Sequence, residues 1–180
     1  MREDEETEAA VDGDSVDTML AEWHSEWPEL DVSSTEVIAR LMRTARLLEE
    51  RFVAQLRRAG GVPIANLGDF DVLHALRRSG PHHALTPGQL RQALIVSSAG
   101  LTGRFNRLER EGWIERGPSP DDGRSTLVRL TEEGRASVDR VLEAHFGLER
   151  EALSVLDPEE RAAIRDSLRK LLVSLEDDAR

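Results

Sequence analysis

The chain has 180 residues, of which 39% are hydrophobic, and it contains no cysteine. Without cysteine it can form no disulfide, no thiolate redox sensor and no cysteine-based zinc site. Its apolar runs are all shorter than the roughly 18 residues that a membrane-spanning helix needs. Its acidic N-terminus lacks the apolar core of a secretion signal, so we expect a cytoplasmic protein with no membrane partner.

Charge is distributed unevenly along the chain, whose formal net charge is −11. Residues 1–36 carry 13 acidic residues and one arginine, whereas residues 37–180 carry 22 acidic and 23 basic residues. Residues 77–129 hold nine arginines against five acidic residues. Because salt screens exposed charges beyond about 8–10 Å, the local excess of arginine governs contact with phosphate. The acidic average therefore does not exclude a nucleic-acid-binding protein.

The N-terminal segment is expected to contain little regular structure. Residues 1–16 are polar, acidic and aperiodic, which predicts a disordered tail. A short helix is expected at Val16–Trp23, before Pro28 interrupts the chain.

Two helices are expected next. Ser33 or Ser34 can cap a long helix that ends at Gly60-Gly61, and a second helix is expected over about Leu67–Arg78. The long helix has an apolar stripe at helical spacing, formed by Val37, Ile38, Leu41, Met42, Ala45, Leu48, Phe52 and Leu56.

The segment after residue 85 has the start signals of two short helices. Thr86-Pro87-Gly88-Gln89 combines a threonine cap, a proline at the first helical position and a glutamine three residues after the cap. Ser97-Ser98 can cap the second helix, Ala99–Arg110. The apolar residues of the second helix lie on one stripe, formed by Leu101, Phe105 and Leu108.

A β-hairpin is predicted directly after these helices. Trp113–Arg116 is expected to form a strand, Gly117–Arg124 a long turn, and Thr126–Leu130 a second strand that alternates polar and apolar residues. Two short helices followed by a basic-tipped hairpin predict a winged helix-turn-helix over about residues 62–130. The fold class is then mainly α with a small β-hairpin wing, and the function is sequence-specific binding of double-stranded DNA.

Four polar residues are the candidates for contact with DNA on or before the second helix: Ser98, Thr102, Asn106 and Arg107. Thr102 and Asn106 lie away from the apolar stripe, as does Arg110, and the four candidates can face a DNA groove. The alternative is that they form an ordinary solvated helix face.

Further helices follow from Glu132 onward. Asp157-Pro158-Glu159-Glu160 has the cap and first-turn proline of a helix start. We expect one domain over residues 17–180, with dimerisation helices at about 17–60 and 131–178. A two-fold homodimer would present two recognition helices to a pseudo-palindromic site. Alternatively, these helices pack only within the monomer.

The winged segment resembles the MarR family of bacterial transcription regulators, over about residues 33–178. The matching residues are the run from Leu101 to Ile114, the wing sequence Asp121-Asp122-Gly123-Arg124, and the run from Val128 to Gly134. The resemblance implies a homodimer held by its N- and C-terminal helices. It also implies that Arg124 reaches a DNA minor groove, where an arginine meets the most negative potential.

The segment Trp23–Asp31 is similar to the N-terminal extension of the urate-responsive members of that family. By this resemblance the ligand-binding residues are Trp23, Asp71, Arg104 and Arg116. Trp27 stands where that subfamily often has arginine, so the tryptophan role can belong to either Trp23 or Trp27.

The chemistry of these residues suits a planar aromatic anion. A tryptophan ring can stack on urate, and the Arg104 guanidinium can bind its oxygens in a bidentate pair. Our hypothesis is that urate competes with Asp71 for Arg104, moves the recognition helix and so weakens DNA binding by a repressor. In the alternative, Asp71 and Arg104 form only a structural ion pair.

Two alternative functions are also compatible with the sequence. The first rival is a regulator of the same fold that responds to a different aromatic or phenolic ligand, such as a phenolic carboxylate, and the second is a helical adaptor that does not bind DNA. We find no nucleophile–base set, no paired carboxylates and no phosphate-binding glycine loop, so we expect no enzyme activity and no cofactor. The histidines do not form a metal-binding pattern.

Overall fold

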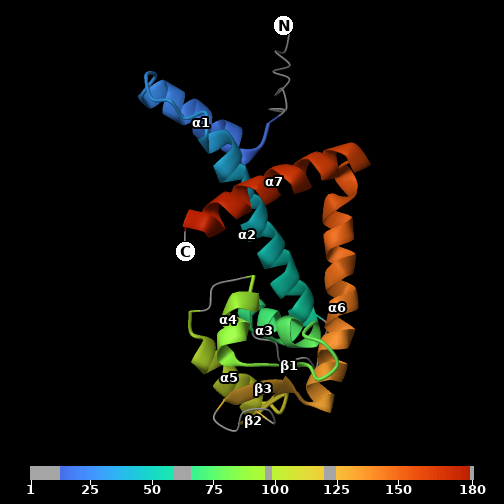
Figure 1. The fold of residues 1–180 in the computed structure, drawn as a ribbon. Helices are drawn as coiled ribbons and strands as arrows, with labels where there is room; N and C mark the ends of the chain where they lie inside the picture. Colours follow the sequence, from blue (N-terminus) through green and yellow to red (C-terminus); the bar gives the residue numbers. More distant parts are fainter. Residues whose placement is uncertain (1–12, 59–65, 96–98, 120–124, 179–180) are drawn as a thin grey trace, which may run out of the picture. The chain divides into compact units, whose positions relative to one another are not determined.

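The computed structural model describes residues 13–58, 66–95, 99–119 and 125–178, and it confirms a mainly helical fold with a small antiparallel sheet (Figure 1). The elements follow in the order α1 Ser15–Glu26, α2 Thr35–Arg58, α3 Leu67–Arg77, β1 Ala84–Leu85, α4 Pro87–Ala93, α5 Leu101–Arg110, β2 Ile114–Pro118, β3 Thr126–Leu130, α6 Glu132–Ala152, the short 3-10 turn Leu153–Val155 and α7 Pro158–Asp178.

The chain divides into two compact units, Met1–Glu50 and Arg51–Arg180. The division lies inside α2, so the last two turns of this helix belong to the second unit. The single domain that we expected over residues 17–180 stays a prediction.

The first unit is held together around the start of α1. Asp14 caps this helix and accepts hydrogen bonds from the backbone of Val16 and Asp17. Arg40 of α2 forms ion pairs with both Asp14 and Asp17. The predicted tail over residues 1–16 was therefore too long, because the Asp14 capping box begins the helix at Ser15. Residues 1–12 lie outside the described part of the chain.

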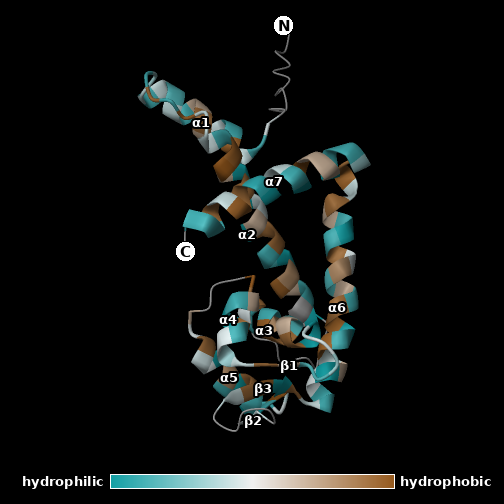
Figure 2. Ribbon diagram, in the orientation of Figure 1, coloured by the Kyte–Doolittle hydropathy of each residue, from teal (hydrophilic) through white to brown (hydrophobic). Residues whose placement is uncertain are grey.

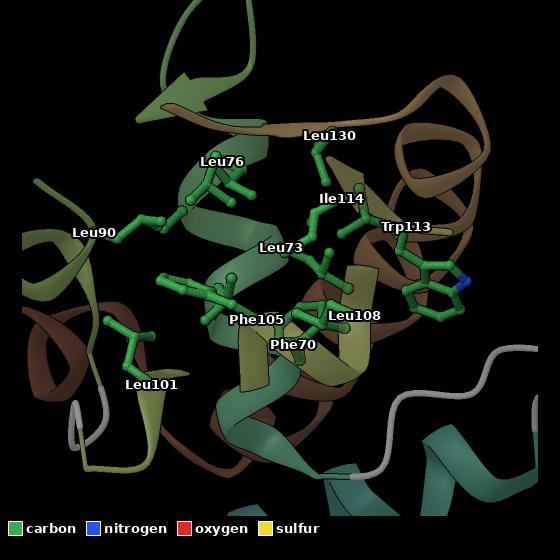
Figure 3. Close-up of a cluster of buried hydrophobic side chains, with 14 of the residues drawn as sticks. Phe70, Leu73, Leu76, Leu90, Leu101, Phe105, Leu108, Trp113, Ile114 and Leu130 are labelled. Atoms are coloured by element: carbon green, nitrogen blue, oxygen red, sulfur yellow. The ribbon is translucent and has the colours of Figure 1, made fainter. Parts of the chain in front are cut away.

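Helix α3 is the centre of the second unit. Eight of its eleven residues are buried, including Phe70, Leu73 and Leu76. Its apolar side chains meet Leu90 of α4, the stripe of α5 and residues of the sheet (Figure 3). A helix that is apolar on nearly all sides must be covered on all sides. This burial places α3 directly behind the recognition helix.

The sheet has three strands in the order β1–β3–β2, all antiparallel. The predicted strand Thr126–Leu130 is confirmed as β3, and β2 begins one residue later and ends two residues later than predicted. The two-residue strand β1 was missed, because it is too short to show an alternating pattern. It pairs Ala84 with Arg129 and Leu85 with Val128.

The backbone of Trp113 joins three elements. Gly112, with φ +76°, ends α5 in the left-handed conformation, and the Trp113 N–H donates to the Leu108 carbonyl at 2.9 Å. The Thr131 N–H donates in turn to the Trp113 carbonyl at 3.1 Å. Gly134 in the first turn of α6 lies so close that a Cβ there would overlap the Trp113 carbonyl. The end of α5, the start of β2 and the start of α6 therefore form one rigid joint.

The helices predicted after Glu132 are confirmed as α6 and α7. Thr131 caps α6, and Asp157 accepts hydrogen bonds from the backbone of Glu159 and Glu160 at the start of α7. Apolar and hydrophilic stretches alternate along α7 (Figure 2), and no side chain of this helix is buried. Its exposed apolar residues are Ile164, Leu168, Leu172, Val173 and Leu175.

In the described part of the chain, no helix combines the length and the apolar character required to cross a membrane.

An aromatic cluster fastens α2, α3 and α6 inside the second unit. The His145 ring lies 4.4 Å from the Phe52 ring and 4.9 Å from the Phe70 ring, and Phe70 stacks on His74 at 5.6 Å. Burial lowers the pKa of His74, as do the charges of Arg78 and His145, against the opposing effect of Asp71 and Glu149.

We expect the fold to lose stability in mild acid because of His74. A histidine whose pKa is lowered by folding contributes stability that is complete above its unfolded pKa of about 6.5 and is lost as the pH falls through its folded pKa. The thermal midpoint should therefore be lower at about pH 5.5 than at about pH 7.5. His74→Phe, which keeps a ring beside Phe70, should reduce this difference. A full pH dependence in the variant would assign the effect to other groups.

Candidate DNA interface and ligand site

The two helices of the predicted helix-turn-helix are present. The Thr86–Gln89 capping box of α4 is confirmed, with hydrogen bonds of 2.8 and 3.2 Å in the two directions. Helix α5 begins at Leu101 and not at Ala99, because Gly100 in the left-handed conformation is its N-cap and no side chain caps it. The predicted DNA contact Ser98 lies outside the described residues, as does the predicted wing contact Arg124.

Helix α5 has one buried and one exposed face. Leu101, Phe105 and Leu108 are buried against the core, whereas Thr102 and Asn106 are exposed. The structure thus places these two predicted DNA contacts on the accessible side of the recognition helix.

Arg107 does not lie on that exposed face. Its guanidinium forms an ion pair with Asp69 of α3, whose side chain is completely buried. The other Asp69 oxygen and the Arg107 Nε are buried without a hydrogen-bond partner among the described residues. We expected Arg107 to face DNA, but in this structure it joins α5 to α3. The sequence contained both residues and no signal that would pair them.

Arg104 also points toward α3. A Cβ on Gly68 would lie only 2.6–2.7 Å from the Nη2 and Nε atoms of Arg104, so the guanidinium covers this glycine. Asp71 of the same helix is buried and accepts a hydrogen bond of 2.7 Å from the Ile95 N–H. Arg104 therefore lies beside the first turn of the helix that carries Asp71.

Arg116 on β2 contacts two other residues of α5. It donates to Asn106 Oδ1 at 3.0 Å and to Glu109 Oε2 at 3.0 Å. The Glu109 hydrogen bond lowers the pKa of the Glu109 carboxyl and raises the pKa of Arg116. The contacts of Arg116 are thus with α5, and its role in a ligand site with Arg104 and Asp71 stays a prediction.

The two tryptophans of the N-terminal extension belong to the first unit. Trp23 lies on α1 and Trp27 follows its last turn, and their exposed fractions are 42% and 54%. Both rings are accessible for stacking on a flat molecule.

Among the described residues, no three histidine, aspartate or glutamate side chains are grouped so that they could hold a metal ion.

A β-hairpin wing within a three-stranded sheet, a recognition helix with an exposed polar face and a buried helix packed against it define a winged-helix DNA-binding protein. The family model of the MarR family matches residues 61–125. The HTH-type transcriptional regulator PecS of Dickeya dadantii is 36% identical over 150 residues, which cover 83% of this chain and 88% of PecS. The chain belongs to the MarR family, and it is a DNA-binding transcriptional regulator and not an enzyme.

Solved structures agree with this assignment. The crystal structure of a mutant MarR from E. coli complexed with operator DNA has a TM-score of 0.65 at 26% identity, and the match covers 80% of this chain and 99% of that one. BpsR of Bordetella bronchiseptica, whose DNA binding is regulated by 6-hydroxynicotinic acid, has a TM-score of 0.58 at 29% identity, with 72% and 90% covered. The adaptor without DNA binding is therefore set aside.

Proposed function

We propose that the protein is a repressor that binds a pseudo-palindromic operator as a homodimer. The exposed Thr102 and Asn106, together with Ser98 and Arg124, supply the DNA contacts, and Arg107 supports α5 from behind. Exposed apolar residues support the dimer. In the second unit they are those of α7, and in the first unit they are Val37, Ile38, Leu41 and Met42 of α2.

The proposed effector is urate or a related planar anion. The observation that carries this proposal is the contact of the Arg104 guanidinium with Gly68, beside the helix that carries Asp71. An anion that binds Arg104 would draw the guanidinium from α3 and loosen the recognition helix. The exposed rings of Trp23 and Trp27 can each stack on a planar anion. The effector weakens DNA binding only if it binds the released conformation more tightly than the DNA-bound one.

The experiment is fluorescence anisotropy of labelled DNA from the gene's own upstream region, with and without urate, at fixed salt. We expect tight binding that urate weakens. Arg104→Ala should abolish the response to urate, and Asp71→Asn should blunt it. Tight binding that urate leaves unchanged in the wild type would refute the effector and retain the repressor.

Gly68→Ala tests the Arg104 contact without removing the arginine. The added methyl group displaces the guanidinium, so we expect weaker DNA binding and a smaller further effect of urate. An alanine in a helix is otherwise favourable by up to about 1 kcal/mol relative to glycine, so the protein should stay folded. Gly103→Ala on α5, where a Cβ meets nothing within 4 Å, is the matched control. Equal urate responses in both variants would contradict the role of this contact.

A second candidate effector is an aromatic carboxylate. The observation in its favour is the likeness to BpsR, which is regulated by 6-hydroxynicotinic acid. A carboxylate can form the same bidentate pair with Arg104. Titration of 6-hydroxynicotinate and a phenolic carboxylate in the same anisotropy assay separates the two candidates.

A further inference from the structure

Arg116 makes a contact that the ligand hypothesis does not explain. Its guanidinium donates to the Asn106 side chain and to the Glu109 carboxylate, which lie one turn apart on α5. A strand of the wing is thus tied to the exposed face of the recognition helix. Among the described residues, Asn106 has no other side-chain hydrogen bond.

The chemistry of this contact fixes the orientation of the Asn106 amide. A guanidinium has only donors, so the amide oxygen of Asn106 must face Arg116. The amide NH2 group then points away from Arg116, and the side chain is exposed. An asparagine that binds adenine in the usual bidentate manner must present its oxygen and its NH2 group together. Arg116 occupies the oxygen side.

We propose that Arg116 is a positioning residue for operator recognition, which holds Asn106 so that its NH2 group faces an acceptor edge in the major groove. Guanine is the base that fits, because it presents two acceptors, N7 and O6, in that groove. This inference rests on the proposed function, since it needs Asn106 at a DNA base.

Glu109 takes part in the same arrangement. A free carboxylate on the DNA-facing side would repel phosphate, and Arg116 neutralises it. The Arg116 hydrogen bond keeps the Glu109 carboxyl ionised to lower pH by lowering its pKa. Removal of Arg116 therefore has two effects, which the experiment must separate: it releases the Asn106 amide and it leaves the Glu109 charge uncompensated.

The experiment measures the affinity for operator DNA in which each guanine in turn is replaced by 7-deazaguanine, which lacks the N7 acceptor. In the wild type we expect about a tenfold loss at one guanine in each half-site, within the range for a good base contact. Asn106→Ala should remove this sensitivity. Arg116→Met should reduce this loss of affinity to about twofold. The double variant Arg116→Met with Asn106→Ala should be no more sensitive to 7-deazaguanine than Asn106→Ala alone.

Two further variants serve as controls. Arg129→Met removes an arginine of the same sheet, which pairs at 3.4 Å with the exposed Glu115, so it tests the loss of charge alone. Glu109→Gln with Arg116→Met restores the net charge and should recover general affinity without the guanine sensitivity. Circular dichroism checks that each variant is folded.

The outcomes distinguish this inference from the proposed function. A wild type that binds operator and random DNA equally would refute sequence-specific repression and this inference with it. A specific wild type whose guanine sensitivity survives Arg116→Met would overturn the inference alone. The inference is also overturned if Arg116→Met weakens binding to all DNA sequences equally, which is the result expected for the charge control Arg129→Met.

Discussion

We expect Gly134→Ala to destabilise the protein by about 2–4 kcal/mol, because overpacking against fixed backbone cannot be relieved by a side-chain rotation. The added Cβ would overlap the carbonyl of Trp113, and its next neighbours are also Trp113 backbone atoms. The same carbonyl accepts the hydrogen bond from Thr131. Urea unfolding followed by circular dichroism gives the change in the free energy of unfolding.

Gly147→Ala is the matched control for this prediction. Gly147 lies in the same helix, α6, but a Cβ there meets only the end of Arg150, at 3.8 Å. This variant should be neutral or more stable by up to about 1 kcal/mol, as expected for alanine in a helix. If the two variants had the same stability, the close approach of α6 to Trp113 would be refuted.

The second large effect is expected for Asp69→Asn. The change removes the negative charge that pairs with Arg107, while the amide keeps nearly the same shape. Loss of one partner of a buried pair costs about 3–5 kcal/mol, and the 29% exposed fraction of the Arg107 side chain reduces this to about 2–3 kcal/mol. Urea unfolding measures this loss in the free energy of unfolding.

A double variant shows whether the cost comes from the uncompensated charge. Asp69→Asn with Arg107→Met removes both charges, so it should recover much of the stability lost in Asp69→Asn. Asp166→Asn, which breaks an exposed pair with Arg165, should leave the free energy of unfolding nearly unchanged. A double variant less stable than Asp69→Asn would contradict our explanation.

The helices and the wing could be predicted because their signals are local. The capping box at Thr86, the apolar stripe of α5 and the alternating strand β3 each depend on residues a few positions apart. Strand β1 could not be predicted, because two residues carry no period and their partners lie more than 40 positions later. The Gly100 cap was missed because Ser97 and Ser98 lie just before it, and serine is preferred to glycine as the first cap of a helix.

The candidate site was predicted less completely, because it depends on the direction in which each arginine side chain of α5 points. Arg104 and Arg107 are one turn apart, and both point to α3. Arg104 lies against Gly68, and Arg107 forms an ion pair with Asp69. We placed Arg107 on the DNA side, because polar residues of a recognition helix commonly lie there. Arg107 instead pairs with the buried carboxylate of Asp69. The burial of Asp69 depends on how α3 packs in the tertiary structure, which the local sequence does not show.

The central place of β3 has a consequence for the order of folding. Strand β3 pairs with β2 across a short hairpin, but with β1 only after a chain segment of more than 40 residues has closed. The entropy cost of closure grows with the length of the loop. We therefore expect the hairpin, fastened to α5 and α6 at Trp113, to form before β1 joins it. Slow closure of β1 would then leave one edge of β3 unpaired late in folding.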